Sequence, residues 1–225
     1  MQNAFVLHVR PYTDSRLLID FFTEHDGLIR AVGRTPGKRD RAKYQPFQPL
    51  ELEFSGSGEL KTLRSCELTN HIAFSLLGHS LFCGLYINEL LLRVLQADEP
   101  FPPLFSFYSG AVQALKANPS HQQTESVLRS LELFLLEQLG FGVDFDSSET
   151  GQPINEERFY FYRAGHGFCE CGQDSGEAIP GHHLSAIDRR DFSDEAILRS
   201  AKIITRAALS PLIGEKPLKS RDLFR

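Results

Sequence analysis

The amino-acid sequence predicts an α+β protein that begins with strands and continues mainly as helices. Up to about residue 75, short runs alternate apolar and polar residues with the period of two that is typical of half-buried strands. Beyond that point, apolar residues recur with helical spacing over segments of helix length. We therefore predict one domain over residues 1–78 and a second, mainly α-helical domain over residues 79–225.

The first domain is predicted to contain five short strands. They cover residues 4–10, 17–23, 28–32, 50–54 and 60–66. The third strand follows a turn at His25, Asp26 and Gly27, and the fifth follows a serine- and glycine-rich stretch that is typical of a hairpin. No segment of helix length lies between the strands, so they fit a small five-stranded barrel of the OB-fold kind. An SH3-like barrel has the same number of strands and remains an alternative.

The second domain is predicted to contain four helices. They cover residues 80–96, 104–117, 124–139, and a last segment that begins at Ser193 and ends before Pro211. The first is apolar nearly all the way round, which is typical of a buried helix. The third ends at Gly140, as expected for a glycine that follows a helix. Residues 142–191 have little periodicity, and we predict an irregular insertion with a small hairpin near Phe159.

Positive charge is concentrated in one short stretch of an acidic chain. The whole chain has 24 Lys and Arg against 29 Asp and Glu, for a net charge of −5. Residues 81–160 alone have 4 basic and 11 acidic side chains. Residues 28–43, in contrast, have six basic side chains and one acidic. Phosphates bind where positive charge gathers in this way, although a solvated surface loop can have the same composition.

Composition and motifs argue against several classes of protein. No apolar stretch approaches the roughly 18 residues that would cross a bilayer, and no signal peptide is recognisable, so we expect a cytoplasmic protein. The four cysteines are too few and too irregularly spaced for a disulfide framework. No Walker-type phosphate loop, G-x-S-x-G or His-Glu-x-x-His motif occurs. The sequence therefore indicates no enzyme class.

One group of residues has the chemistry of a metal site but the wrong spacing. Cys169 and Cys171, together with His182 and His183, offer the thiolate and imidazole groups that zinc prefers. A Cys-x-Cys pair is not the spacing of a zinc finger or ribbon, however. We therefore interpret these residues as incidental and assign no metal.

The last helix has a basic stripe. Arg199, Lys202 and Arg206 follow one another at intervals of three and four residues, which places them on one face beside an apolar stripe. Such a surface suits a peptide that is both acidic and hydrophobic. The solvated face of an ordinary amphipathic helix explains the same pattern, and the residues alone favour that explanation.

Several stretches, taken in order, resemble the RecO family of bacterial recombination mediators. They are Ala4-Phe-Val-Leu7 with Arg10-Pro11, Gly27-Leu-Ile-Arg-Ala-Val-Gly33, Gln45-Pro-Phe-Gln-Pro-Leu50, Gly58-Glu-Leu-Lys-Thr-Leu-Arg-Ser65, Gly84-Leu-Tyr-Ile-Asn-Glu-Leu-Leu91, Gln138-Leu-Gly-Phe-Gly142, and Lys216-Pro-Leu-Lys-Ser-Arg-Asp-Leu-Phe-Arg225. No single stretch is diagnostic, but their order and spacing are specific. The resemblance covers nearly the whole chain.

The resemblance implies a DNA repair protein that is not an enzyme and needs no cofactor. It implies an OB-fold and a helical C-terminal domain, binding of single- and double-stranded DNA, and annealing of complementary strands. It also implies partnership with RecR and with single-stranded DNA-binding protein in the loading of RecA. By position, the expected DNA contacts are Arg30, Arg34, Lys38, Arg39, Arg41 and Lys43, with Lys61 and Arg64 on a neighbouring strand. The acidic tail of single-stranded DNA-binding protein is expected to bind Arg129, Lys202 and Arg206.

The chain departs from the family at the zinc site that many members have. In those members the first cysteine pair falls just after the Leu-Gly-Phe/Tyr-Gly segment. Here residues 146–151 read Asp-Ser-Ser-Glu-Thr-Gly, and only Cys169 and Cys171 remain. Two cysteines cannot complete a tetrahedral site, so we expect a zinc-free insertion that is held by packing.

Two other functions fit the same pattern of strands and helices. An OB-fold protein can bind structured RNA as an assembly factor. A hydrolase could use the region around His182 and His183. The enzyme is the weaker alternative, because no nucleophile and base are suitably spaced.

Overall fold

The computed structural model describes residues 1–37, 41–69 and 75–224. The chain forms two compact units, Met1–Asn118 with Pro217–Arg225, and Pro119–Lys216. The composition of the chain changes near residue 78, whereas its packing changes at residue 118. Among the described residues, no helix combines the length and the apolar character that a membrane span requires.

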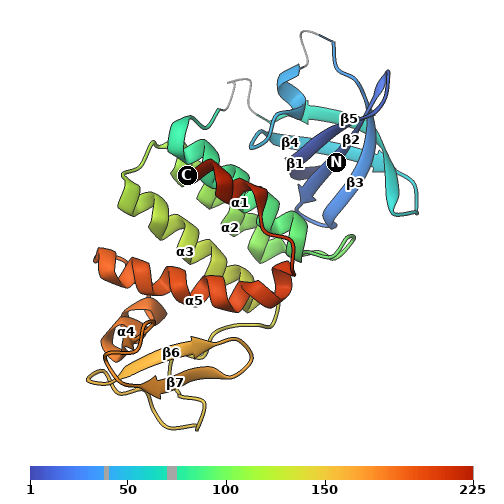
Figure 1. Cartoon of the computed structure of the whole chain (residues 1–225). Helices are drawn as coiled ribbons and strands as arrows, with labels where there is room; N and C mark the ends of the chain where they lie inside the picture. The colour runs from blue at the N-terminus through green and yellow to red at the C-terminus, as the bar shows by residue number, and fades with distance from the viewer. Residues whose placement is uncertain (38–40, 70–74, 225) are drawn as a thin grey trace. The chain divides into compact units, whose positions relative to one another are not determined.

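Five strands close a barrel in the first unit (Figure 1). They are β1 (Gln2–Thr13), β2 (Arg16–Thr23), β3 (Gly27–Arg34), β4 (Pro49–Ser55) and β5 (Leu60–Leu68). Their order is β1-β2-β3-β5-β4, with β4 pairing back to β1 and β3 running parallel to β5. This order is that of an OB-fold, which confirms the predicted barrel and excludes the SH3-like alternative. The inner face is filled by residues such as Val6, Ile19 and Phe21.

The turn between β2 and β3 sets the register of this hairpin. Gly27 has a φ of +66°, in the left-handed region that glycine enters at little cost. The Thr23 hydroxyl accepts a hydrogen bond from the Asp26 amide at 3.2 Å and donates one to the Gly27 carbonyl at 3.0 Å. Thr23 then pairs with Gly27, and the ladder runs without a break to the pair Arg16 and Arg34.

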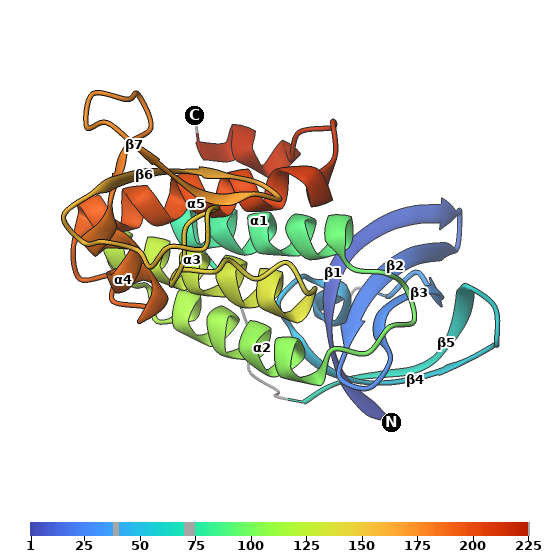
Figure 2. The ribbon, with the colours of Figure 1, turned by 90° about the horizontal axis from the view of Figure 1, so that it is seen from below.

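Two helices, α1 (Gly78–Val94) and α2 (Pro102–Lys116), lie beside the barrel in the same unit (Figure 2). The ring of Phe5 on β1 contacts the rings of Phe105 and Tyr108 on α2. A buried polar link accompanies these contacts. The Asn88 amide donates to the Leu7 carbonyl at 3.1 Å, and its oxygen accepts from the Tyr108 hydroxyl at 2.7 Å. Because these buried groups are hydrogen-bonded, the bonds offset the cost of removing them from water, and the link orients the helices.

The end of the chain returns to α1 as the short 3-10 helix η2 (Lys219–Phe224) (Figure 1). The Glu89 carboxylate accepts hydrogen bonds from the backbone amides of Lys219, at 2.9 Å, and Ser220, at 2.7 Å. Burial opposes the charged form of Glu89. The hydrogen bonds from Ser220 and Lys219 nevertheless hold the pKa of this carboxyl below its usual value.

A change of pH is expected to weaken this attachment. Because the pKa of Glu89 is lower in the folded than in the unfolded chain, its contribution to stability is complete above the unfolded value and is lost as the pH falls through the folded value. We expect Glu89→Gln to melt at a lower temperature than the unsubstituted protein at pH 7, and the difference to shrink as the pH is lowered below about 4.5. Thermal unfolding of both proteins over that range checks this. A difference independent of pH would contradict it.

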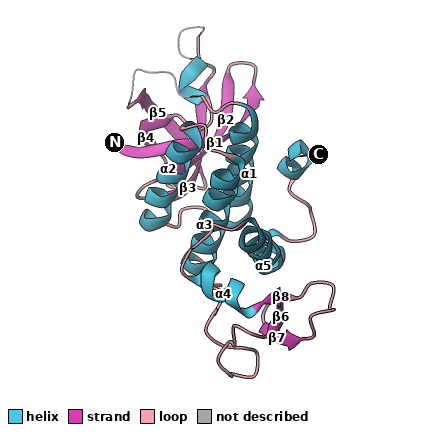
Figure 3. Ribbon diagram, turned by 90° about the vertical axis from the view of Figure 1, so that its left-hand side faces the viewer, coloured by secondary structure: helices cyan, strands magenta, loops and turns pink. Residues whose placement is uncertain are grey.

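The second unit contains a helix pair and a small sheet (Figure 3). Its elements are α3 (His121–Gln138), β6 (Phe159–Arg163), β7 (Gly167–Cys171), β8 (Ile179–Pro180), α4 (Gly181–Asp188) and α5 (Glu195–Ile213). The β6–β7 hairpin confirms the predicted one. Sequence analysis missed α4, a short helix without a side-chain cap that packs Leu184 and Ile187 into the core of the unit.

The structure tests three predicted helix ends in this unit. Gly140 follows α3 with a φ of +78°, as predicted. The predicted bounds of α5 are wrong at both ends. Asp194, not Ser193, is the N-cap, because its carboxylate accepts from the Ala196 amide at 2.6 Å. The helix also includes Pro211 and ends soon after it, at Ile213.

Candidate nucleic-acid interface

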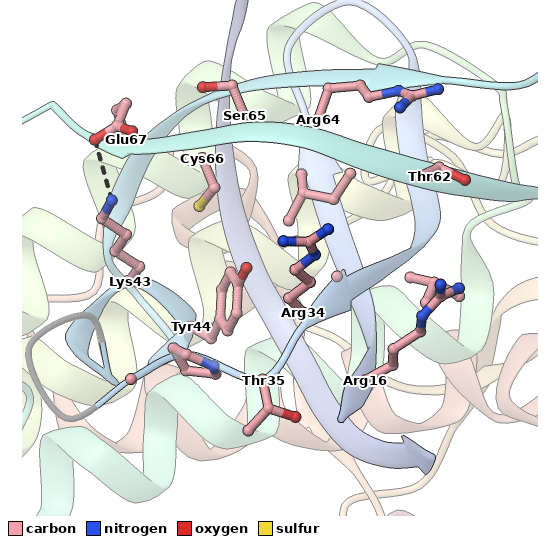
Figure 4. Close-up of a pocket in the computed structure, with 15 residues that line it drawn as sticks. Arg16, Arg34, Thr35, Lys43, Tyr44, Thr62, Arg64, Ser65, Cys66 and Glu67 are labelled. Atoms are coloured by element: carbon pink, nitrogen blue, oxygen red, sulfur yellow. Dashed lines mark hydrogen bonds and ion pairs between the residues drawn. The ribbon is translucent and has the colours of Figure 1, made fainter. Parts of the chain in front are cut away.

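A cavity of about 640 Å³ opens on the barrel between β3 and β5 (Figure 4). Within the described residues, these parallel strands pair from Arg30 with Leu60 to Val32 with Thr62. Beyond the last pair the cavity is lined by the ends of both strands and by Tyr44 of the short 3-10 helix η1 (Arg41–Tyr44). The brevity of the β3–β5 ladder therefore creates the opening.

The lining of this cavity is strongly basic. Four of its side chains are cationic, namely Arg16, Arg34, Lys43 and Arg64, and one, Glu67, is acidic. Lys43 and Glu67 form an ion pair at 3.1 Å (Figure 4). Within the described ranges, the three arginines form no ion pair. Guanidinium groups without a carboxylate partner are well suited to bind phosphate oxygens.

The cavity gains no negative charge from the thiol in its wall. Cys66 is almost completely buried, and burial raises its pKa to about 12, with Lys43 acting in the opposite direction and Glu67 in the same direction. The thiol is therefore neutral at physiological pH. Glu67, already paired with Lys43, is the sole anionic side chain among the described lining residues.

Three of the predicted DNA contacts line this cavity: Arg34, Lys43 and Arg64. They come from different segments of the chain, at the end of β3, in η1 and in β5. Arg64 also donates from Nε to the Ser55 hydroxyl at 2.7 Å, which holds its side chain on the outer side of β5. Its terminal guanidinium nitrogens make no hydrogen bond to a described residue.

The structure does not bring Arg30 and Lys61 to the cavity, although both were expected to contact DNA. Arg30 Nε lies 2.6 Å from an oxygen of Asp20, which stands opposite it in the β2–β3 ladder. Lys61 Nζ lies 3.1 Å from Asp98, in the loop after α1, and its side chain is largely buried. Each of these cations is held by a carboxylate outside the cavity, and their assignment as DNA contacts stays a prediction.

The remaining basic-loop residues cannot be placed at the cavity. Lys38 and Arg39 lie outside the described residues. Arg41 begins η1, but its side chain also lies outside what the structure describes. Their assignment as DNA contacts stays a prediction.

Arg16 is a cavity residue that sequence analysis missed. It begins β2 and is separated from the basic loop by almost the whole hairpin. The position of the predicted turn could have revealed Arg16. A hairpin that turns at residues 24–26 pairs Thr23 with Gly27, and counting outwards along both strands then pairs Arg16 with Arg34. The same count places Asp20 opposite Arg30.

Two of the three residues predicted to bind an acidic peptide, Arg129 and Lys202, form a network between α3 and α5. Arg129 is only 3% exposed. Its Nη1 lies 2.9 Å from Glu132 and donates to the Thr205 hydroxyl at 3.2 Å. Lys202, on α5, lies 3.1 Å from Glu125.

This network is balanced within the chain. Burial opposes the charged form of Glu125, but Arg129 and Lys202 hold the pKa of this carboxyl below its usual value. Two cations therefore meet two carboxylates, and Arg129 is not presented to a peptide as expected. Arg206 is exposed and, among the described residues, has no ion pair.

The cysteines and histidines considered as metal ligands have other contacts. Cys169 donates to the Glu149 carboxylate at 2.9 Å, and burial together with that carboxylate raises the pKa of the thiol. His182 and His183 begin α4, and His183 Nδ1 lies 2.8 Å from the Ser200 hydroxyl. In the part of the chain that the structure describes, no three His, Cys, Asp or Glu side chains are grouped so as to hold a metal ion.

Comparison with known proteins identifies the family. The family model described as recombination protein O N terminal matches residues 1–72, and the model described as recombination protein O C terminal matches residues 78–222. The chain belongs to the RecO family. The DNA repair protein RecO of Klebsiella pneumoniae (strain 342) is 44% identical over 228 residues, covering 100% of this chain and 92% of that protein. The DNA repair protein RecO of Salmonella schwarzengrund is 45% identical, covering 100% and 93%. RecO membership thus confirms the resemblance seen in the sequence.

Proposed function

We propose that this RecO-family protein binds DNA at the barrel cavity and acts as a recombination mediator without catalysing a reaction. The observation that carries the proposal is the gathering of Arg16, Arg34 and Arg64 at one opening of an OB-fold, in a chain whose net charge is −5. Contacts with phosphates are independent of base sequence, and they release counterions. A mediator that acts at any sequence needs this kind of binding.

Strand annealing and RecA loading extend this proposal. Neutralising the phosphates of one strand reduces its repulsion from a complementary strand, which favours pairing. Family membership supports a role with RecR in the loading of RecA onto DNA coated by single-stranded DNA-binding protein. Docking on that protein would raise the local concentration of the barrel beside the coated strand.

For the acidic tail of single-stranded DNA-binding protein, we propose Lys202 and Arg206 as the contacts on α5. Arg206 is exposed and Lys202 is half-buried, so both can reach a carboxylate from solvent. Arg129 then acts as a positioning residue, because it holds Glu125 and Glu132 in the network that orients Lys202.

Removing two cavity arginines is expected to weaken DNA binding strongly. We expect the double substitution Arg16→Ala/Arg34→Ala to lower affinity for an oligonucleotide by about 10- to 100-fold at low salt, since each lost charged hydrogen bond contributes about 1 kcal/mol or more. The slope of log affinity against log salt should become shallower by about 1.4 for a single strand, because about two phosphate contacts are lost. Fluorescence anisotropy at several salt concentrations measures both quantities.

A matched control is Arg158→Ala, an exposed arginine of the second unit that pairs with Glu170. It removes one arginine from outside the cavity and should leave both affinity and salt slope nearly unchanged. Equal effects of the control and the double variant would refute the cavity assignment. Competition by an RNA strand of the same sequence separates this function from RNA binding, since a DNA mediator should prefer DNA.

A further inference from the structure

A β-bulge lies where β1 approaches the cavity arginines. Pro11 of β1 pairs with Leu17 of β2, whereas Thr13 pairs with Arg16. Two steps along β1 therefore correspond to one step along β2, and Tyr12 is the extra residue. Bulges of this kind re-aim a side chain and often lie beside functional sites.

The bulge directs the Tyr12 ring to the outer side of the barrel. Leu17 packs against the inner cluster of the barrel, and Pro11 shares its side of the sheet by pairing. Alternation turns Tyr12 to the side opposite Pro11. Because the bulge interrupts the alternation at this point, Thr13 and its partner Arg16 lie on the same side as Tyr12. Tyr12 is 51% exposed.

Nothing in the described part of the chain explains this exposed ring structurally. Among the described aromatic residues of the barrel strands, Tyr12 alone is exposed. Its ring contacts no other aromatic ring of the described residues, and its hydroxyl forms no hydrogen bond with them. Other rings of these strands, such as Phe21 and Phe22, are fully buried.

Tyr12 continues the row of arginines across the sheet. Arg34 of β3 stands opposite Arg16 of β2, which stands opposite Thr13, the next residue after Tyr12. Neighbouring strands are about 4.8 Å apart, so an aromatic ring and two guanidinium groups follow one another over three strands. Such a row combines a stacking surface with phosphate ligands, as single-strand binding proteins do.

We propose that Tyr12 stacks on an unpaired base while Arg16 and Arg34 hold neighbouring phosphates. This inference rests on the proposed function and assigns the site its preferred ligand, single-stranded DNA. A base within a duplex is already stacked on its neighbours, so the ring adds affinity only for unpaired bases. Phosphate contacts by the arginines serve both forms of DNA.

Substitution of Tyr12 is expected to affect one of three ligands of equal length. We expect Tyr12→Leu to weaken binding of an oligothymidylate about tenfold, since stacking of one base on an aromatic ring contributes about 1–3 kcal/mol. Binding of a duplex, and of an abasic strand with the same number of phosphates, should be unchanged. Tyr12→Phe keeps the ring and should bind all three ligands as the unsubstituted protein does.

A fluorescent variant provides a direct readout of stacking. The chain contains no tryptophan, so Tyr12→Trp introduces a single indole. Its emission should be quenched when the oligothymidylate binds and should change little when the abasic strand binds. Circular dichroism of each variant checks that the fold is retained.

The outcomes separate this inference from the function on which it rests. If Arg16→Ala/Arg34→Ala loses affinity but Tyr12→Leu binds oligothymidylate normally, stacking by Tyr12 is refuted and the DNA site stands. If Tyr12→Leu weakens the duplex, the abasic strand and oligothymidylate equally, the ring only supports the local structure and the inference is wrong. If the unsubstituted protein binds neither the oligothymidylate, the duplex nor the abasic strand, both the DNA site and stacking by Tyr12 are refuted.

Discussion

Replacing Arg129 with alanine is expected to destabilise the second unit by about 3–5 kcal/mol, because it removes the guanidinium that is ion-paired with a buried carboxylate. The Glu132 side chain is only 1% exposed and lies 2.9 Å from the guanidinium. The Glu132 carboxylate also accepts a hydrogen bond from the Thr205 hydroxyl at 2.5 Å, but a neutral hydroxyl does not replace the charge of the guanidinium. Urea denaturation followed by circular dichroism measures the loss.

Two further variants isolate the cause. Arg206→Ala removes an exposed arginine of α5 and should change stability by no more than about 0.5 kcal/mol. Arg129→Met/Glu132→Leu removes both charges of the buried pair and should recover most of the loss, since an apolar replacement of a buried ion pair is often neutral. If Arg129→Ala were as stable as Arg206→Ala, the network would not contribute to stability as described.

This result bears on the acidic-tail site. A loss of peptide binding in Arg129→Ala would have an ambiguous cause, because the helix pair itself is weakened. Arg206→Ala is the variant that tests the contact, and it should lower the affinity for the tail peptide while leaving DNA binding intact. Unchanged peptide binding in this variant would exclude Arg206 from the site.

Replacing Gly27 with alanine is expected to destabilise the first unit by about 2–4 kcal/mol, from a backbone clash added to a strained φ. A Cβ atom at this position would lie 1.7 Å from the Glu99 carbonyl oxygen. The φ of +66° is also one that alanine rarely adopts. Relief would require residues 97–99 to move away, which would disturb the hydrogen bond from the Asp98 amide to the Leu28 carbonyl, now 3.1 Å long.

The matched control for this prediction is Gly110→Ala. Gly110 lies within α2, and a Cβ there would meet nothing within 4 Å. We expect this variant to be more stable by about 0.5–1 kcal/mol, because alanine favours the helix. Thermal unfolding of the two variants should therefore shift in opposite directions. A Gly27→Ala variant as stable as the unsubstituted protein would show that the turn tolerates a side chain.

Most of the fold could be predicted from local patterns. Alternation of apolar residues is enough to find strands, and Gly27 and Gly140 mark a turn and a helix end through their conformational freedom. What failed were features with competing local signals. Asp194 replaced Ser193 as the cap of α5, since both types of side chain can accept the first amides. The short helix α4 has too few turns to produce a clear period.

The candidate DNA site was only partly predictable. Arg34, Lys43 and Arg64 were chosen because they belong to, or lie beside, a basic stretch, and all three line the cavity. The same reasoning selected Arg30 and Lys61, which do not line the cavity. Hairpin counting would have added Arg16 and flagged Arg30, because the turn determines which residues face each other. No local pattern would have paired Lys61 with Asp98, which lies beyond α1.

The amino-acid sequence by itself thus determines which segments are strands or helices, how the β2–β3 hairpin aligns, and that positive charge gathers near the end of β3. Folding in three dimensions selects which of those charges are available to a ligand. Arg129 is neutralised by Glu132 on its own helix and joined to Thr205 on another, while Lys61 is held by Asp98, which lies beyond α1. The physical reason is that secondary structure depends on neighbours in sequence, whereas the pairing of a charge depends on carboxylates that packing brings within about 4 Å.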